Sequence, residues 1–417
     1  MNIQKLKGTQ DILPEEIGRW RDIEDISRRI FSNYAYREIR TPIIEEAGLF
    51  VRSVGKDTDI VKKQMYSFKN QGGRDIALRP EETAPVVRAY LENNLDKTQG
   101  FVKLFYMGPM FRSERPQAGR FRQFSQVGIE AIGSYSPYLD AEVIILLDEL
   151  LKGYGLKNYA FKINSLGCEK DKKKIKDILK KELKYSLNSL CKDCQRRYKT
   201  NILRILDCKS SACKKIAKAV SLKGALCKEC SDDFILIQKL LDKAKVRYEI
   251  TPILVRGLDY YTKTIFEVAA EGLGAQDAIA AGGRYDNLVS DLGGDKTGAC
   301  GFAIGIERVI EVLSKVPKPT LKEKELIFIV TIGDEAYEEG FKILSELRRS
   351  GLSADIDYQQ KSLKAQMRYA NKIGASYVIV LGEDELKSKK VNIKDMKDSS
   401  QRSVAIKDLK DAFNKKD

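Results

Sequence analysis

One stretch of the chain, residues 168–247, differs from both of its flanks and so limits how the chain can fold. It holds 23 lysines and arginines against 10 aspartates and glutamates, a net charge of +13, whereas the whole 417-residue chain carries +15. Almost all of the positive excess therefore lies in one segment. We expect a basic, cysteine-containing helical insertion at 168–247, between two regions, 1–167 and 248–316, that have ordinary globular patterns.

The charge of this insertion has two interpretations. A solvated lysine-rich surface is common and needs no partner. A local field this one-sided also favours a surface that binds a polyanion, although charge alone does not distinguish RNA from DNA or from a lipid surface.

The C-terminal part of the chain has a different pattern. The segment KVPKPTLKEKE, residues 315–325, is rich in proline and charge and is typical of a linker. Beyond it, apolar strand patterns such as ELIFIVTIG alternate with amphipathic helices expected at 335–350 and 363–373, and a polar hairpin follows. This alternation predicts a small α/β domain at 325–417 with a mostly parallel sheet.

Two absences exclude whole classes of function. The chain contains no histidine, so no mechanism can depend on a histidine base or ligand. It also has no run of 18 apolar residues and no apolar signal segment in MNIQKLKGTQD, so we expect a cytoplasmic protein with no membrane partner.

Eight cysteines in such a chain are typical of metal ligands or buried thiols rather than disulfides. Cys191, Cys194, Cys227 and Cys230 form two CxxC pairs that could supply four thiolates to a tetrahedral Zn²⁺ ion. Free thiols in a small helical insertion are the alternative. Cys208 and Cys213 lie between the two pairs, and Cys168 and Cys300 have the character of packing residues.

The segment from Gly108 to Glu130, GPMFRSERPQAGRFRQFSQVGIE, interleaves arginines with aromatic residues. They are Arg112, Arg115, Arg120, Arg122, Phe111, Phe121 and Phe124. A guanidinium group binds phosphate or carboxylate through two hydrogen bonds, and a neighbouring ring can stack on a base. An arginine-rich hairpin on a wet surface is the plainer alternative, but the aromatic spacing is not that of a solvated face.

Three short segments, in this order, resemble the signature motifs of the class II aminoacyl-tRNA synthetases. The first is IRTPIIEE with Pro42, the second is the arginine segment with Arg112, Glu114 and Phe124, and the third is GFAIGIERVI with Arg308. Each motif alone is weakly specific, but the three in order are strongly so. Class II enzymes for proline, threonine or glycine would share them.

Two further segments are similar to those peculiar to the histidyl-tRNA synthetase family, namely LVRGLDYYTKTIFEV (254–268) and AAGGRYDNLV (280–289). With LRPEETAP (78–85), the resemblance extends over essentially the whole chain. It implies an α/β multidomain protein with a six- or seven-stranded antiparallel sheet flanked by helices. The catalytic domain would comprise 1–167 and 248–316, with the insertion between them and an anticodon-binding domain at 325–417.

The resemblance implies the activity of a histidine–tRNA ligase, with ATP, L-histidine and tRNA(His) as partners. Histidine would first be activated to its adenylate, a step whose carboxylate nucleophile is already ionised and needs no general base. The site must instead supply positioning and positive charge. By resemblance, Arg112 would bridge the carboxylate and the α-phosphate from one side, and Arg256 would hold the α-phosphate from the other. Arg308 would bind the γ-phosphate end of ATP or cover the face of the adenine. Glu114 and Phe124 would bind the adenine, and Mg²⁺ would neutralise the β- and γ-phosphates.

The family pattern also assigns a histidine pocket. Glu81, Thr83 and Gln126 match positions that bind the α-ammonium group, while Glu130 and Tyr261 match the imidazole contacts, with Tyr260 close by. A carboxylate and a phenol satisfy the one donor and one acceptor of an imidazole. Analogues that lack them would be rejected by about 10⁴–10⁵, so no editing domain is needed.

Other consequences of the resemblance concern partners and departures from the family. Arg115, Arg120 and Arg122 would contact the tRNA acceptor end, and the motif of Pro42 implies a homodimer. Many relatives carry histidine where this chain has Ser113 and Ser125, so the histidine-free composition is either selected or engineered. A regulatory paralogue without catalysis is the second reading, but such proteins usually lose the ATP-binding arginines and the C-terminal domain, both of which are present here.

Overall fold

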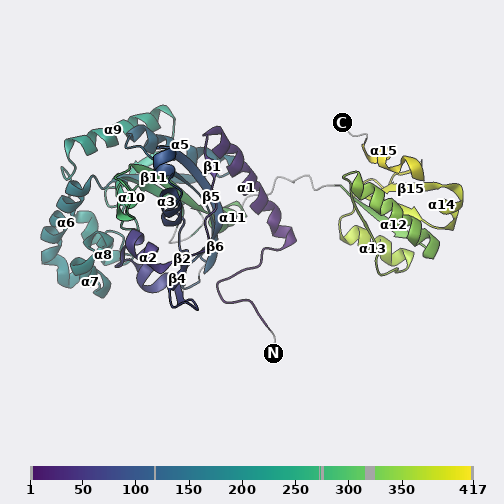
Figure 1. Cartoon of the computed structure of the whole chain (residues 1–417), viewed down its shortest axis with the longest axis horizontal. Coiled ribbons are helices and arrows are strands. Elements are labelled where there is room, and N and C mark those ends of the chain that lie inside the picture. The colour runs from purple at the N-terminus through teal and green to yellow at the C-terminus, as the bar shows by residue number, and fades with distance from the viewer. Residues whose placement is uncertain (1–2, 117–118, 272, 274–276, 315–324, 415–417) are drawn as a thin grey trace. The chain divides into compact units, whose positions relative to one another are not determined.

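The computed structural model describes residues 3–116, 119–271, 273, 277–314 and 325–414. It divides into two compact units, Met1–Pro317 and Lys318–Asp417 (Figure 1). The predicted linker at 315–325 lies outside the described residues, except for Glu325.

The first unit is built on an eight-stranded sheet. In spatial order its strands are β1 (Arg37–Glu38), β5 (Val102–Phe111), β6 (Gln123–Ile132), β11 (Ala299–Gly305), β10 (Ala278–Arg284), β9 (Thr262–Ala270), β7 (Tyr159–Ser165) and β8 (Tyr248–Ile250). The six inner strands are antiparallel, which confirms the expected sheet. The two short edge strands, β1 and β8, pair in parallel with their neighbours β5 and β7, outside the antiparallel part of the sheet.

The two faces of the sheet have different surroundings, and strand β6 shows why. Val127, Ile129 and Ala131 belong to one apolar core, with α1 (Pro14–Asn33) and α5 (Pro137–Gly153). Because successive side chains of a strand point to opposite faces, the residues between them face away from this core. Figure 1 shows α1 and α5 beside the sheet.

The other face lies near a small subdomain. It contains a three-stranded sheet, β2 (Ile44–Glu46), β4 (Asp75–Leu78) and β3 (Tyr66–Lys69), in that order. The helical segments of this region are α2 (Ala47–Phe50), η1 (Val51–Gly55), η2 (Ile60–Gln64), α3 (Thr83–Glu92), α4 (Leu95–Thr98) and α10 (Leu288–Asp291), and α11 (Ile306–Leu313) follows β11.

The insertion is built mainly from helices, as expected. Its helical segments are α6 (Glu169–Leu183), η3 (Lys184–Ser189), α7 (Lys192–Thr200), η4 (Ile202–Ile205), α8 (Ser211–Ala219) and α9 (Lys228–Lys243). Apolar residues such as Leu183 and Ile205 share one core with Tyr106 and Tyr285 of the main sheet region. The insertion therefore packs on the sheet-containing domain and has no separate core of its own among the described residues.

The second unit alternates strands and helices, as predicted. Its elements are β12 (Leu326–Thr331), α12 (Asp334–Arg349), β13 (Ser353–Ile356), α13 (Leu363–Lys372), β14 (Tyr377–Leu381), α14 (Glu383–Ser388), β15 (Lys390–Asp395), β16 (Gln401–Ala405), η5 (Ile406–Asp408) and α15 (Leu409–Asn414). The sheet order is β13-β12-β14-β15-β16. Only the first three strands are parallel, because the polar C-terminal hairpin joins the same sheet antiparallel, so the sheet is mixed rather than mostly parallel.

None of the helices among the described residues combines the length and the apolar character that crossing a bilayer would require.

Candidate active site

Strand β6 places Glu130 on the face of the sheet away from α1 and α5. Its side chain is buried, and Oε1 accepts a 2.6 Å hydrogen bond from the hydroxyl of Thr83 while Oε2 accepts one from the phenol of Tyr285. Burial raises the pKa of Glu130 to about 8; the two hydrogen bonds oppose this rise, and the nearby Glu81 carboxylate adds to it. A buried carboxylate with this environment favours a ligand that brings an N–H donor or a positive charge.

Glu81 lies at the N-terminus of α3, close to the same carboxylate. Its two oxygens accept the backbone N–H groups of Thr83 and Ala84 at 2.8 and 3.0 Å, so it satisfies amides that have no partner within the helix. Burial raises its pKa, whereas Arg112 and the two amides act to lower it. The segment LRPEETAP therefore brings Glu81 and Thr83 to Glu130, as expected of residues that share a pocket.

A third buried acidic group, Glu82, was not among the predicted residues. Its carboxylate pairs with Arg79 at 2.9 Å, and both side chains are almost fully buried. Arg79 also donates to the carbonyl oxygens of Thr41 and Pro109 at 3.0 Å each. Burial raises the pKa of Glu82 to about 7. Arg79 thereby connects the segment before Pro42 to strand β5. Thr41 and Pro109 lie too far from Arg79 in sequence for a local pattern to predict these contacts.

Tyrosines form the wall beside Glu130. The rings of Tyr260 and Tyr261 lie 4.7 Å apart between centroids, and Tyr260 meets Tyr285 edge to face at 5.6 Å. Burial raises the pKa of all three phenols, so they remain protonated donors. Tyr285 was missed as an individual residue, although its segment AAGGRYDNLV was recognised.

Gly128 makes room for a fourth phenol at this wall. A Cβ at position 128 would lie 2.3 Å from the hydroxyl oxygen of Tyr106, which faces it from β5. Only glycine therefore allows Tyr106 to lie between Gln126 and Glu130, which flank position 128 on the same face.

Gln126 has a buried side-chain oxygen, Oε1, with no hydrogen-bond partner among the described residues. A buried acceptor left without a donor costs about 1–3 kcal/mol, which a ligand donor would recover. Its neighbour Ser125 donates its backbone N–H to Glu307 at 2.8 Å, and burial raises the pKa of Glu307 to about 7.

The second predicted motif forms the hairpin of β5 and β6. The guanidinium carbon of Arg112 lies 5.2 Å from the centroid of the Phe124 ring, and its Nε donates to the carbonyl of Pro80 at 2.8 Å. Arg112 is therefore positioned by the chain beside Glu81. Glu114 forms a 2.9 Å ion pair with Arg120, so the carboxylate expected at the adenine is here held by the motif loop.

The remaining arginines of this loop lie nearer the surface. Arg115 is exposed, and the backbone N–H of Arg122 donates to Gly8 at 2.6 Å. Gly8 has a φ of +91°, and a Cβ there would lie 2.9 Å from the Arg122 side chain. The N-terminal segment therefore supports the loop. Ser113, where relatives often carry histidine, is exposed.

Arg256 and Arg308 reach the region from other elements. Arg256 pairs with Glu267 on β9, and its Nε is buried without a partner among the described residues. Arg308, on α11, donates to the carbonyls of Gly119 and Ala278. Burial lowers the pKa of Arg308, and the nearby positive charge of Arg120 lowers it further, so positive charges gather here as phosphate binding requires.

The loop that carries Arg256, Tyr260 and Tyr261 is held by the insertion. Lys172 on α6 donates to the carbonyls of Asp259 and Tyr261 at 3.0 Å each. Asn201 donates to Asp259 Oδ1 at 2.8 Å, and Arg204 reaches the carbonyl of Gly257 at 3.4 Å. No local pattern predicts these contacts, since they join segments more than fifty residues apart.

The structure separates the two CxxC pairs. Cys191 and Cys194 lie with Cys208 and Cys213, whereas Cys227 and Cys230 lie with Cys168 and Asp171. The predicted four-thiolate set therefore does not converge at one point. Cys168, expected to be a packing residue, belongs to the second group, while Cys300 is buried in β11.

The sequence of the chain matches two known family profiles. Residues 8–309 match the family profile described as histidyl-tRNA synthetase, and residues 326–416 match the anticodon binding domain. The chain is 45% identical over 419 residues to the histidine–tRNA ligase of Thermodesulfovibrio yellowstonii, with 100% of this chain and 99% of that protein covered. It is 47% identical over 418 residues to the histidine–tRNA ligase of Desulfitobacterium hafniense, with coverage of 100% and 99%.

Solved structures show the same likeness. The crystal structure of apo histidyl-tRNA synthetase from S. aureus superposes with a TM-score of 0.84 at 36% identity, covering 99% of this chain and 100% of that one. A protein from Bacillus halodurans described as an ATP phosphoribosyltransferase regulatory subunit/histidyl-tRNA synthetase has a TM-score of 0.68 at 22% identity, covering 92% and 99%. The second likeness concerns the fold alone.

Proposed function

The chain belongs to the histidyl-tRNA synthetase family and acts as a histidine–tRNA ligase, and on this premise we propose which residues perform each step. Residues 1–167 and 248–316 form the catalytic domain, 168–247 the insertion, and 325–417 the anticodon-binding domain. In the first step, an oxygen of the histidine carboxylate bonds to the α-phosphorus of ATP, and pyrophosphate leaves. In the second, a terminal ribose hydroxyl of tRNA(His) takes the histidyl group from the adenylate, and AMP leaves.

Three arginines supply the charge for the first step. Arg112 and Arg256 hold the α-phosphate and the incoming carboxylate, and Arg308 binds the far end of ATP. The contact of Arg112 with Pro80 and that of Arg256 with Glu267 fix these guanidinium groups before the substrates arrive, which favours electrostatic catalysis. Glu114 and Phe124 bind the adenine. Mg²⁺ enters with ATP as part of the substrate and neutralises the β- and γ-phosphates.

The histidine pocket is supported by one observation above all, the gathering of buried acceptors around Glu130. Glu81, Glu82 and Glu130 are all buried, and Gln126 offers an unpartnered oxygen. We assign the α-ammonium group to Glu81, Thr83 and Gln126. The imidazole would lie between Glu130 and Tyr261, against the ring of Tyr260. An ammonium group and an imidazole N–H are the donors that such a set lacks.

The transfer RNA would meet two parts of the chain. Arg115, Arg120 and Arg122 of the motif loop contact the acceptor end, and the C-terminal domain binds the anticodon. The basic insertion, with a net charge of +13 over 168–247, would attract the acceptor stem. We also propose one resident metal, a Zn²⁺ ion bound by cysteines of the insertion. None of these cysteines is among the residues assigned to the substrates.

A second copy of the chain would cover the apolar face of the three-stranded sheet. Ile44 and Phe68 are 51% and 48% exposed, and their strand partners Leu78 and Ile76 lie on the same face. This face follows directly after Pro42, whose motif implies a homodimer. Sedimentation of an Ile44→Asp variant should show monomers, whereas Ser67→Asp on the opposite face should remain dimeric. A dimeric Ile44→Asp variant would contradict this interface.

The test of the site is ATP–pyrophosphate exchange with each amino acid in turn. We expect exchange with histidine alone, and its loss in Arg256→Ala. Arg21→Ala is the matched control, because Arg21 is an exposed arginine of helix α1, outside the motif segments. Wild-type exchange in Arg256→Ala would remove this residue from the α-phosphate. No exchange with any amino acid would favour a regulatory role or a site disabled by Ser113 and Ser125.

A further inference from the structure

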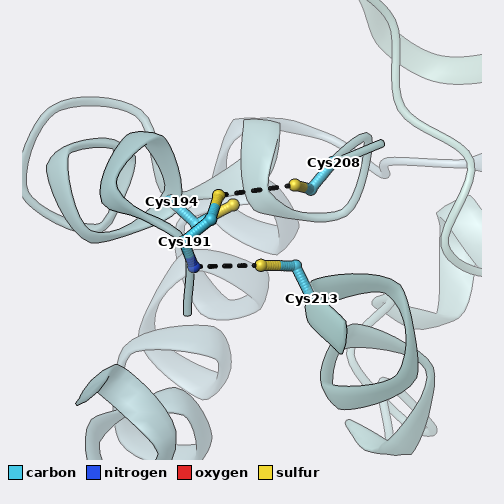
Figure 2. A group of neighbouring side chains, drawn as sticks. All are labelled: Cys191, Cys194, Cys208 and Cys213. Atoms are coloured by element: carbon cyan, nitrogen blue, oxygen red, sulfur yellow. Dashed lines mark hydrogen bonds between the residues drawn. The ribbon is translucent and has the colours of Figure 1, made fainter. Parts of the chain in front are cut away.

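Four cysteines from neighbouring segments of the insertion bring their sulfur atoms together. Cys191 precedes α7 and Cys194 lies in its first turn, Cys208 follows η4, and Cys213 lies in the first turn of α8. The four sulfur atoms lie within 4.8 Å of one another, and Figure 2 shows their side chains converging. We propose that this group binds one Zn²⁺ ion as a tetrathiolate site.

The spacing of the sulfur atoms fits such a site. Zinc–thiolate bonds of about 2.3 Å in a tetrahedron place the sulfur atoms about 3.8 Å apart. The Sγ atoms of Cys191 and Cys208 are 3.8 Å apart, along the upper dashed line of Figure 2. Buried cysteines that act only as small apolar residues have no reason to meet four at a time at this spacing.

The backbone around the group favours thiolates. The N–H of Cys191 donates to Sγ of Cys213 at 3.2 Å, the lower dashed line of Figure 2. Three of the cysteines lie at the N-terminal ends of α7 and α8, where the helix dipole and unpaired amides stabilise negative charge. Lysines and arginines dominate the surrounding sequence, so the charge of a zinc tetrathiolate would be offset.

Burial also agrees with a structural metal. Cys194, Cys208 and Cys213 are buried and Cys191 is half-buried, and none of the four forms a disulfide. A closed set of four protein ligands with little solvent is the usual form of structural zinc, whereas catalytic zinc keeps a position for water. The ion would tie residues 191–213 together and contribute to the stability of the insertion.

The second group is a less suitable donor set. The carboxylate of Asp171 accepts the backbone N–H groups of Cys168 and Cys227 at 3.3 and 3.0 Å, so it serves as a cap at the start of α6. Cys227 is exposed. We therefore assign the metal to the four-cysteine group alone.

The direct test is the zinc content of the full-length chain, produced with zinc in the medium, purified without chelators and measured by plasma mass spectrometry. We expect one zinc ion per chain, lost in Cys208→Ser and retained in Cys227→Ser, which alters the second group. Absence of zinc, together with no uptake of added Zn²⁺ by the reduced chain, would overturn the proposal. Loss in Cys227→Ser with retention in Cys208→Ser would move the site to the other group.

A second measurement covers the case in which Cys208→Ser does not fold. Co²⁺ added to the reduced, zinc-free full-length chain should give tetrahedral ligand-field bands and intense thiolate-to-cobalt charge transfer. Cys208→His keeps a ligand at this position and should still bind, with charge transfer reduced by the loss of one thiolate. A spectrum identical to that of the unaltered chain would show that Cys208 is not a ligand, and would contradict the proposed set.

Discussion

The hydroxyl of Thr83 donates a 2.6 Å hydrogen bond to Oε1 of Glu130, across 47 residues of sequence. Thr83 begins helix α3, and Glu130 lies on strand β6. The bond fixes the carboxylate from one side while Tyr285 holds it from the other. Glu130 is therefore oriented before a ligand arrives, so little side-chain entropy would be lost on binding.

Glu130→Gln should stabilise the empty protein and weaken histidine binding. The folded-state pKa of Glu130, about 8, lies above its ordinary value, so the native chain binds more protons than the unfolded chain between those values. The stability of the unaltered protein should therefore fall as the pH rises to about 8, and the variant should lack this fall. At pH 8 we expect a gain of roughly 1–2 kcal/mol in unfolding free energy.

Chemical denaturation between pH 5 and pH 9 measures this difference, and exchange kinetics measure the binding. KM for histidine should rise roughly 10- to 100-fold, because a charge-assisted hydrogen bond is lost. Glu92→Gln, at an exposed position, is the control. A variant less stable than the unaltered protein at pH 8 would show that the carboxylate of Glu130 is not strained by burial.

Arg120→Ala should weaken tRNA binding and reduce its dependence on salt. Arg120 lies in the motif loop, and its ion pair with Glu114 leaves donors for a phosphate. Loss of one phosphate contact should lower the slope of log K against log salt by about 1. Filter binding at several salt concentrations checks this, with Arg21→Ala as the control. Unchanged affinity and slope would remove Arg120 from the tRNA interface.

Asn201→Ala should impair the use of histidine although Asn201 lies in the insertion. Its side chain donates to Asp259, which precedes Tyr260 and Tyr261 in the loop. Loss of one such bond, about 1 kcal/mol, should raise KM for histidine several-fold and change kcat less. Asn188→Ala, also in the insertion and exposed, should have no effect. Equal behaviour of the two variants would argue against a role of the insertion in holding this loop.

Ser125→His restores the residue that many relatives carry. The contact of Ser125 with Glu307 uses its backbone amide, so the replacement leaves that bond intact. We expect turnover to change by less than about threefold, a barrier change below about 1 kcal/mol. Steady-state aminoacylation measures it. A strong increase would instead mean that the serine lowers activity in exchange for a chain free of histidine.

The family resemblance implied the antiparallel sheet, whereas local pattern predicted the alternating strands and helices of the C-terminal domain and the segments that carry the site. The arginines and phenylalanines of β5 and β6 share one hairpin, so their proximity follows from sequence alone. Met110 lies directly opposite Phe124, and Gly108 opposite Gln126. Such pairs require only the register of two neighbouring strands.

Contacts between distant segments could not be predicted in this way. Tyr285 reaches Glu130 across 155 residues, and Cys208 lies with Cys191 although the two CxxC pairs indicated that Cys191 would lie with Cys227. In both cases the partner is set by how helices and strands pack, which periodicity does not specify. The ion pair of Arg79 with Glu82 was not predicted for the same reason, because an arginine and a glutamate three residues apart can form either a buried or an exposed ion pair.

The hydrogen bonds that Lys172, Asn201 and Arg204 donate to the loop at 256–261 limit which segments can be deleted from this protein. An insertion that merely decorated the surface could be excised, and the ends rejoined, without harm to the remaining domain. Here excision would remove the donors that hold three backbone carbonyls and the Asp259 carboxylate next to the proposed imidazole pocket. The basic insertion is thus no detachable module, and a minimal synthetase made from this chain would have to replace its scaffold rather than omit it.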